Sequence, residues 1–183
     1  QWASLPSLFS EDRQPNTKYL MIPKVTSERR HYIPFAFLEP SIIINNTASY
    51  IPEASLYVFG ILESKMHMAW VNYICGRTKS DFIYSNKIVY NNFPWPENPS
   101  EKQIKSIEVA AQSILDVRTE FPDSSLADLY DPLYTPQKLL KAHGALDKAV
   151  DLAYRSQQFT NDSNRMEYLF NLYEKYTDPI SSA

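Results

Sequence analysis

A proline-rich segment, residues 91–100 (NNFPWPENPS), divides this chain of 183 residues into two halves with different apolar periodicity. Proline lacks an N–H and fixes φ, so neither a helix nor an interior strand continues through three prolines in ten residues. Before the segment, short β-branched and aromatic runs alternate with turn residues. After it, apolar residues recur every three or four positions. The sequence therefore predicts an α+β fold, with a mixed α/β domain over residues 1–95 and a small all-α domain over residues 96–183.

The first half is expected to hold short strands and one long helix. Large apolar residues at three- and four-residue spacing predict that helix over residues 55–75, with Gly76 as its C-cap. Tyr57, Phe59, Met66, Trp70 and Tyr73 are expected to form its core stripe. Four runs rich in β-branched and aromatic residues are expected to be strands, namely residues 18–25, 32–38, 42–46 and 82–90.

Three helices are expected in the second half. Ser100 and Gln103 have the spacing of a capping box at the start of the first helix. Thr135 is expected to cap the second helix, with Pro136 in its first turn. The third helix is expected to begin at about Asp162.

The charge of the chain is unevenly distributed. Residues 1–95 carry nine Lys and Arg against seven Asp and Glu, and residues 96–183 carry nine against fourteen, so +2 and −5 sum to the net −3. The basic-leaning half is therefore the part expected to approach a polyanion, and the acidic helices are expected to brace it or to complete a clamp. One cysteine, Cys75, permits no intramolecular disulfide, and we expect a cytoplasmic protein without a membrane span.

No catalytic centre is expected in this chain. Three glycines cannot supply the glycine-rich turn of an S-adenosylmethionine site. Residues 92–95 (NFPW) resemble the Asn-Pro-Pro-aromatic loop of amino-methylating enzymes, but Phe93 replaces the first proline. An aromatic–proline packing segment is therefore expected there. Residues 63–65 (ESK) match part of a nuclease metal motif, but they fall in the expected helix.

The histidines do not have the spacing of a metal site. His31, His67 and His143 are scattered, and Cys75 has no partner at metal-ligand spacing, so zinc is not expected. His143 lies on an apolar helix face and is expected to be a hydrogen-bonded interface histidine. The N-terminal Gln1 is not a natural start, and we expect the chain to be part of a longer one.

Two polar stretches, residues 24–30 (KVTSERR) and 77–85 (RTKSDFIYS), have the composition of a DNA-binding surface. Lys and Arg neutralise phosphates, Ser and Thr donate to phosphate oxygens, and a Lys/Asp alternation can address both bases of one pair. The alternative is that these are solvated charged loops.

At these residues the chain resembles the C-terminal portion of MmeI-type (type IIL) restriction–modification enzymes and related DNA adenine methyltransferases. The similar segments, in order, include SERRHYIPFAFL, FGILESKMHMAW, GRTKSDFIYSNKIVY with NNFPWP, LLKAHGALDKAVDLAY and RMEYLFNLYEKY. They cover about residues 16–176. The resemblance implies a target-recognition domain followed by a C-terminal helical domain.

The resemblance also implies roles for particular residues. Lys79, Asp81 and Ile83 correspond to base-reading positions, with a further contribution from Thr47 and Ala48. Members with Lys and Asp at the first two positions resemble those that read G beside the target adenine. This agrees with the chemistry, since a Lys ammonium donates to guanine and an Asp carboxylate accepts from the cytosine amino group. Seven residues are expected to contact phosphates: Lys24, Ser27, Arg29, Arg30, Arg77, Tyr84 and Ser85.

The expected function is sequence-specific recognition of double-stranded DNA for a bacterial adenine methyltransferase, in a restriction–modification or phage-defence enzyme. No cofactor is expected in this chain. S-adenosylmethionine, and Mg²⁺ if a nuclease is fused, are expected on a longer parent chain, whose methyltransferase domain would be a partner. One alternative is a protein-interaction module whose helices dock a partner without DNA contact. Another is a self-contained methyltransferase or nuclease, against which the missing glycine loop argues.

Overall fold

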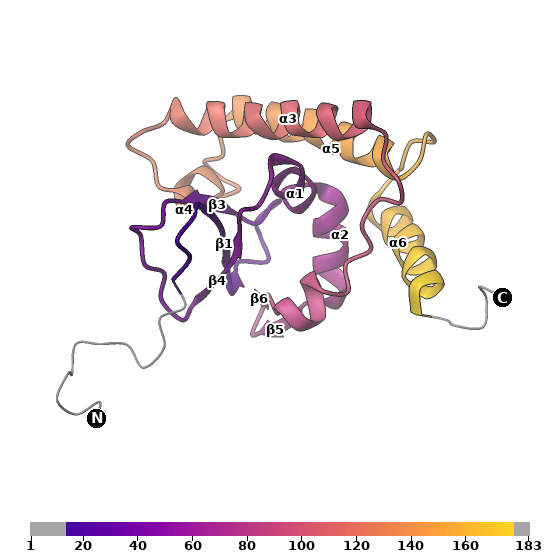
Figure 1. Ribbon diagram of the computed structural model, residues 1–183, viewed down its shortest axis with the longest axis horizontal. Helices are drawn as coiled ribbons and strands as arrows, with labels where there is room; N and C mark the ends of the chain where they lie inside the picture. Colours follow the sequence, from indigo (N-terminus) through magenta and orange to yellow (C-terminus); the bar gives the residue numbers. More distant parts are fainter. Residues whose placement is uncertain (1–13, 178–183) are drawn as a thin grey trace.

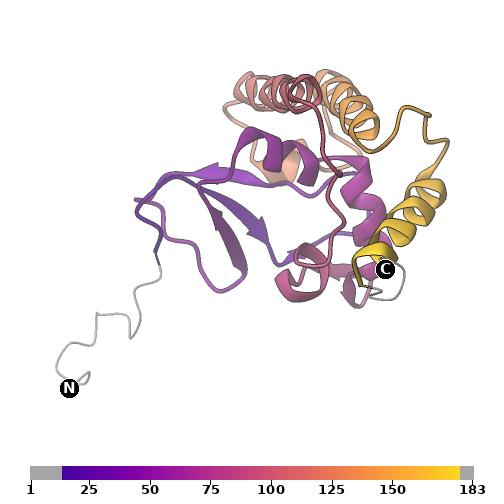
Figure 2. The same ribbon diagram turned by 45° about the vertical axis from the view of Figure 1, so that its right-hand side comes forward.

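A computed structural model describes residues 14–177 of the chain. Two long antiparallel helices lie side by side along one side of the molecule, and two small sheets lie on the other side, with shorter helices between them (Figures 1 and 2). The last helix runs down the flank of the molecule. This arrangement is the α+β fold that the sequence predicts, with strands confined to the first half.

The first sheet has three antiparallel strands in the order β3-β1-β4. The central strand, β1 (Tyr19–Pro23), pairs with β3 (Ala36–Leu38) and β4 (Ala48–Pro52), and Leu20 lies opposite both Phe37 and Ile51. The β1 side chains Tyr19, Leu20 and Ile22 are almost fully buried. Pro23 stands at the end of its strand, where a missing N–H is tolerated.

The second sheet is antiparallel with the order β2-β6-β5. It comprises β2 (Val25–Thr26), β6 (Asp81–Ile83) and β5 (Gly76–Thr78). Lys24 separates β1 from β2, so the expected strand over residues 18–25 passes from one sheet to the other at this residue. The two sheets are therefore joined by continuous chain.

The expected helix over residues 55–75 is two helices, α1 (Leu56–Leu62) and α2 (Lys65–Ile74). The Ser64 hydroxyl accepts from the N–H of His67 and so caps α2, a cap that the apolar spacing did not show. Gly76 does not adopt the left-handed C-cap conformation that was predicted, because Cys75 ends α2 in extended geometry and Gly76 begins β5.

Three strand predictions are wrong in part or in whole. Residues 42–46 form no strand, and Ile42 and Ile43 are exposed because the segment is a surface loop. Only Ala36–Leu38 of the segment 32–38 is a strand. The segment 82–90 turns after Ile83 into a short π-helix, η2 (Asn86–Tyr90), whose first turn is capped by Ser85.

The second half contains α3 (Glu101–Thr119), α4 (Leu126–Leu129), α5 (Gln137–Tyr154) and α6 (Asp162–Thr177). The Ser100–Gln103 capping box is confirmed at the start of α3. The predicted Thr135 cap of α5 is wrong, because Pro136 occupies the cap position and the Thr135 hydroxyl donates to the carbonyl of Asp131. No helix within residues 14–177 is long and apolar enough to cross a membrane.

One hydrophobic core runs across the predicted domain boundary at residues 95 and 96. Helix α1 packs on α3, and α6 packs on α2. Gly60 of α1 lies directly against α3, since a Cβ placed there would be 2.7 Å from Cγ2 of Ile107. The two predicted domains also include residues 1–13 and 178–183, which lie outside the described part of the chain.

A buried polar cluster also joins the two halves. The Arg118 guanidinium on α3 donates to Glu63 Oε1 at 2.6 Å and to the Phe35 carbonyl at 2.8 Å. Tyr130 bonds the same cluster and contacts His143 Nε2 at 2.8 Å. Burial raises the pKa of Glu63 to about 7, although Arg118 acts in the opposite direction. The Glu63 carboxylate therefore has a structural role and is not available as a nuclease metal ligand.

The aromatic segment between the halves packs as predicted. Phe93 is buried against His67, Trp70 and Trp95. The predicted core stripe of the first helices holds for Phe59, Met66 and Trp70, and Tyr57 is half-buried. It is wrong for Tyr73, which is 59% exposed because it lies on the outer side of the last turn of α2.

Candidate nucleic-acid interface

The small second sheet has one buried face and one open face. On the buried side, Phe82 pairs with Thr26 and Arg77, and the Phe82 and Thr26 side chains are almost fully inaccessible. Side chains alternate between the faces of a strand, so the neighbours of Phe82 point the other way. We call this opposite side the outer face; its members are Val25, Gly76, Thr78, Asp81 and Ile83. The outer face therefore presents two of the predicted base-reading residues, Asp81 and Ile83, together.

Lys79 lies at the tip of the β5–β6 hairpin. Thr78 pairs with Asp81, so Lys79 and Ser80 are the two turn residues. Lys79 has φ 55°, the left-handed region that an L-residue seldom occupies. Among the described residues, no hydrogen bond or ion pair holds the side chain of Lys79 or Asp81. The tip of the hairpin therefore offers an uncommitted cation and an uncommitted carboxylate, two residues apart.

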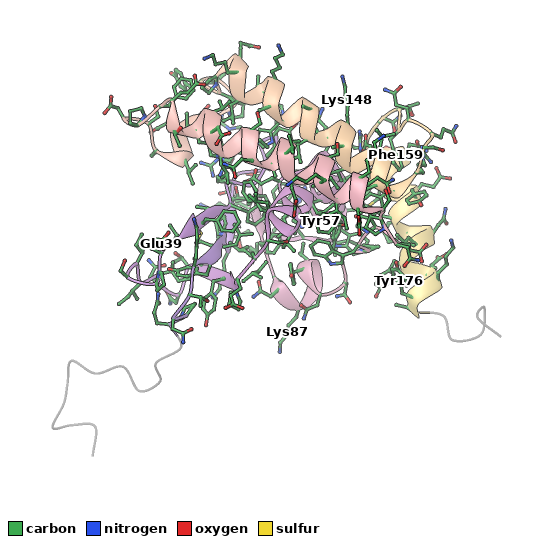
Figure 3. All side chains as sticks on the ribbon, turned by 45° about the horizontal axis from the view of Figure 1, so that its top comes forward. Glu39, Tyr57, Lys87, Lys148, Phe159 and Tyr176 are labelled. Carbon is green, nitrogen blue, oxygen red and sulfur yellow. The ribbon has the colours of Figure 1, made fainter. Side chains whose placement is uncertain are left out.

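The hairpin lies on the side of the molecule away from α3 and α5 (Figure 1). The acidic half of the sequence therefore places its two longest helices opposite the candidate interface. Figure 3 shows the same separation, with Lys148 of α5 and Lys87 of η2 projecting on opposite sides.

Lys24 joins the two segments that were predicted to read bases. Its N–H donates to the Thr47 carbonyl at 2.9 Å, and its carbonyl accepts from the N–H of Tyr84 at 2.8 Å. Its ammonium donates to the Asn46 carbonyl at 2.8 Å. Thr47 in turn donates its N–H and its hydroxyl to the Asn45 side chain. Thr47 and the adjacent Ala48, at the start of β4, are thus fixed next to the end of β6.

The predicted phosphate contacts of the 24–30 stretch fall on a turn after β2. Ser27 and Arg30 close this turn through a backbone hydrogen bond of 3.2 Å. Arg29 is exposed, and no hydrogen bond or ion pair within residues 14–177 holds its guanidinium. The Arg30 side chain instead reaches Thr26 Oγ1 at 3.3 Å and the Ala127 carbonyl at 3.5 Å. Arg29 is therefore the cation of this turn that is free to meet a phosphate.

Arg77 is exposed, but its guanidinium makes several contacts within the chain. Its guanidinium donates to Glu28 at 3.0 Å and to the Ser80 carbonyl at 3.0 Å, and it lies 4.3 Å from the Phe82 ring centroid. These contacts tie the hairpin to the turn after β2. A phosphate contact by Arg77 stays a prediction, and it would compete with Glu28.

The prediction that Tyr84 contacts phosphate is wrong in this structure. Tyr84 is 2% exposed, and its hydroxyl lies 3.0 Å from His67 Nε2. His67 Nδ1 lies 2.9 Å from the Leu62 carbonyl, which can only accept, so Nδ1 carries the proton and Tyr84 donates to Nε2. Burial lowers the pKa of His67 to about 4, which keeps the ring neutral. Tyr84 therefore anchors the end of β6 on α2. Ser85 is half-buried, and its hydroxyl caps η2.

Sequence reasoning missed two contributors to this surface. Val25 is 55% exposed and lies opposite Ile83 on the outer face, which the alternation with buried Thr26 could have indicated. Glu28 fixes Arg77, and nothing in the spacing of these two residues predicts the pair. Cys75 also supports the hairpin, since its thiol donates to the Ile83 carbonyl and burial raises its pKa to about 11.

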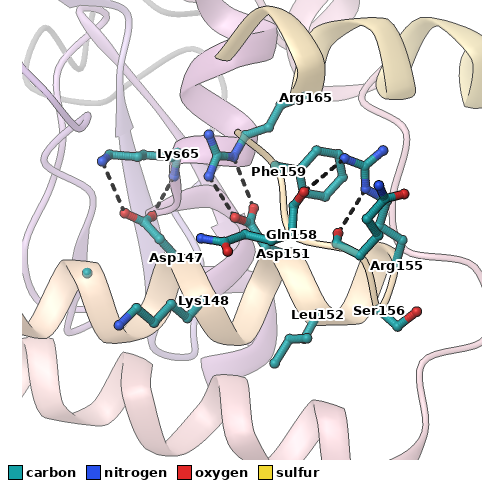
Figure 4. Close-up of a pocket in the computed structure, with 12 residues that line it drawn as sticks. Lys65, Asp147, Lys148, Asp151, Leu152, Arg155, Ser156, Gln158, Phe159 and Arg165 are labelled. Atoms are coloured by element: carbon teal, nitrogen blue, oxygen red, sulfur yellow. Dashed lines mark hydrogen bonds and ion pairs between the residues drawn. The ribbon is translucent and has the colours of Figure 1, made fainter. Parts of the chain in front are cut away.

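A pocket of about 620 Å³ lies elsewhere, between α5 and the start of α6 (Figure 4). Its charged groups are largely paired with each other. Asp147 accepts from the Lys65 backbone at 2.8 Å, and Asp151 accepts two hydrogen bonds from Arg165. No group of three His, Cys, Asp or Glu residues within 14–177 could hold a metal ion. The pocket therefore offers neither a metal site nor an unpaired acid for catalysis.

Comparisons with known proteins identify the family. Residues 1–97 match the family model described as "MmeI, target recognition domain", and residues 99–181 match "MmeI, C-terminal domain". This chain belongs to the MmeI family and comprises these two domains.

Two individual proteins are similar over nearly the whole chain. "DNA methyltransferase A" of Bacillus subtilis (strain 168) is 39% identical over 176 residues, 96% of this chain and 20% of that protein. A solved structure described as "Structure of Type IIL restriction-modification enzyme MmeI in complex with DNA has implications for engineering of new specificities" is 45% identical with a TM-score of 0.90. It covers 97% of this chain and 24% of the solved chain. This chain thus spans a fifth to a quarter of these relatives.

Proposed function

We propose that this chain recognises a specific sequence in double-stranded DNA on behalf of an adenine methyltransferase that lies on a longer parent chain. The observation that carries the proposal is the exposed β5–β6 hairpin, with unpaired Lys79 and Asp81, inside a region that matches a target recognition domain. An antiparallel ribbon fits the major groove, where base pairs are distinguishable. The two similar proteins, named for DNA methylation and for a complex with DNA, support it.

Within this proposal, Lys79 and Asp81 read one G·C pair immediately 3′ of the target adenine. The ammonium donates to O6 and N7 of guanine, and the carboxylate accepts from the N4 amino group of cytosine. Ile83, Thr47 and Ala48 approach neighbouring bases, because Lys24 fixes their backbones beside each other. Arg29 is the main phosphate contact in this proposal. Further contacts come from Lys24, Ser27, Arg30, Arg77 and Ser85, whose side chains also make contacts within the chain.

The chemistry belongs to the parent chain in this proposal. S-adenosylmethionine would supply the methyl group there, and Mg²⁺ would be required if a nuclease is fused to it. The cytoplasm is the proposed location, where DNA is accessible and a single cysteine stays reduced. The partner in the same chain is the methyltransferase domain, which would hold the duplex from its other side.

A charge exchange at the hairpin tests the proposal. In the full-length protein, Lys79→Glu with Asp81→Arg should change the preferred base beside the methylated adenine from G to C, because the donors and acceptors are inverted. A good base contact contributes about 1–3 kcal/mol of discrimination, so methylation mapping should detect the change. The matched control is Lys105→Glu with Glu108→Arg, which inverts an exposed ion pair on α3 and should leave the motif unchanged. An unchanged motif in the hairpin variant would refute the assignment.

A further inference from the structure

The outer face of the second sheet carries an exposed apolar pair, Val25 and Ile83, of which Val25 has no role in the proposed function. Val25 and Ile83 are cross-strand partners, 55% and 37% exposed. On the other side of Ile83 stands Gly76, where an added Cβ would meet no atom within 4 Å. Val25 and Ile83 therefore form a small exposed apolar surface, and the space above Gly76 next to it is unoccupied by protein atoms.

Packing does not account for this pair. The sheet is anchored from its buried side by Phe82 and Thr26, and neither Val25 nor Ile83 belongs to the hydrophobic core. A single exposed apolar residue is ordinary on a protein surface. Here two such residues lie opposite each other on a three-stranded sheet, on the same face as Asp81, two residues along the strand from Ile83.

We propose that Val25 and Ile83 form one contact for the 5-methyl group of a thymine, with Val25 as a specificity-determining residue of this chain. The inference rests on the proposed function, because it requires the outer face to lie in the major groove.

The chemistry of the groove identifies the ligand. Aliphatic side chains neither donate nor accept hydrogen bonds, so they cannot distinguish the polar groups of base edges. The thymine methyl is the apolar group that a standard base pair presents in the major groove. Two branched side chains with a gap at Gly76 can surround it, whereas a guanine or adenine edge there would lose hydrogen bonds to water.

The proposal is tested in the full-length protein by removing one methyl group at a time from the DNA. Once the recognised motif is mapped, each thymine in either strand is replaced in turn by deoxyuridine, which removes only the methyl group. We expect one position at which the replacement weakens binding about fourfold, the value for about 0.8 kcal/mol of lost methyl burial. At that position, 5-methylcytosine should bind more tightly than cytosine, because the two share every polar group and differ in the methyl alone.

Substitutions then assign the contact to the protein. Val25→Ala and Ile83→Ala should each bind the thymine and deoxyuridine duplexes with nearly equal affinity. Val109→Ala is the matched control, because Val109 is 59% exposed on α3, away from the sheet, and this variant should keep the fourfold preference. Val25→Thr keeps the shape and strand propensity of valine, so a reduced preference in this variant assigns the effect to the lost methyl group rather than to misfolding.

The outcomes separate this inference from the proposed function. A wild-type protein without sequence preference would refute the proposed function itself. A mapped motif in which no thymine responds to deoxyuridine would refute the methyl contact alone. A preference that survives in Val25→Ala and Val25→Thr would overturn the role of Val25.

Discussion

Two glycines in helices provide a test of how tightly the two halves of the chain are packed. Gly60 lies in α1 and Gly144 in α5. An added methyl group at Gly60 would lie 2.7 Å from Cγ2 of Ile107, 3.2 Å from Cβ of Ala111 and 3.3 Å from Cδ1 of Leu146. At Gly144 it would meet nothing within 4 Å. The same substitution therefore meets a crowded interface in one helix and open space in the other.

The magnitude follows from two opposing effects. Gly→Ala in a helix interior gains about 0.8–1 kcal/mol of intrinsic propensity at either position. Forcing an extra methyl group into a packed core costs about 1–3 kcal/mol. Ile107 cannot move aside easily, because Cγ2 is bonded to its Cβ and β-branched side chains are stiff at χ1. Gly144→Ala should therefore stabilise the chain by up to about 1 kcal/mol, and the difference between the two variants, which cancels propensity, should be about 1–3 kcal/mol.

Urea unfolding followed by far-UV circular dichroism measures both free energies, with thermal unfolding as a second measure. A domain of this size changes its Tm by roughly 2–4 °C per kcal/mol. The expected order of stability is Gly144→Ala, then wild type, then Gly60→Ala. If Gly60→Ala were as stable as Gly144→Ala, the close approach of α1 to α3 would be refuted.

Two further predictions concern the buried cluster and the candidate interface. Burial holds the pKa of Glu63 at about 7 in the folded protein, above its ordinary 4.5, so its contribution to stability is complete below about pH 4.5 and is lost as pH rises through 7. When the pH rises from 5 to 8, the free energy of unfolding of wild type should therefore fall by about 2–3 kcal/mol more than that of Glu63→Gln, at about 1.4 kcal/mol per pH unit. Parallel pH profiles of the two proteins in urea unfolding would contradict this. Arg29→Ala should lower the slope of log affinity for DNA against log salt by about one and leave the Tm unchanged, because no hydrogen bond or ion pair within residues 14–177 holds its guanidinium. Arg77→Ala should lower the Tm, because it removes the contacts to Glu28, Ser80 and Phe82. A reversed pattern in these two variants would refute the assignment of one as a phosphate contact and the other as a support of the hairpin.

Local sequence signals decided several elements of this fold. The capping box at Ser100 and Gln103, the apolar spacing of α5 and the prolines of residues 91–100 each act over a few residues, so they can be read without tertiary information. The expected base-reading role of Lys79 and Asp81 came from family resemblance, and spacing alone left those residues as solvated loops.

Strand predictions from local sequence were wrong where the tertiary structure provides no partner strand. Residues 42–46 and 86–90 have strong strand propensity, yet the first forms an exposed loop and the second a π-helix, because strand propensity depends on a partner strand. Tyr84 lies in a polar stretch typical of a DNA contact. Because side chains alternate along a strand and Ile83 is exposed, Tyr84 points to the buried side and contacts His67.

Four features could be read from the sequence, because they depend on composition and on neighbouring residues: the α+β class, the three long helices of the second half, the break at residues 91–100 and the charge difference between the halves. Three contacts became known from the three-dimensional structure: Lys24 holds Thr47 beside Tyr84, Arg77 pairs with Glu28, and Val25 lies opposite Ile83. The separations in sequence are 23, 49 and 58 residues, and no periodicity acts over such distances. These contacts form because the chain passes from the first sheet to the second at Lys24. Ile22 of the first sheet and Phe82 of the second are buried in one common core, which holds the two sheets together.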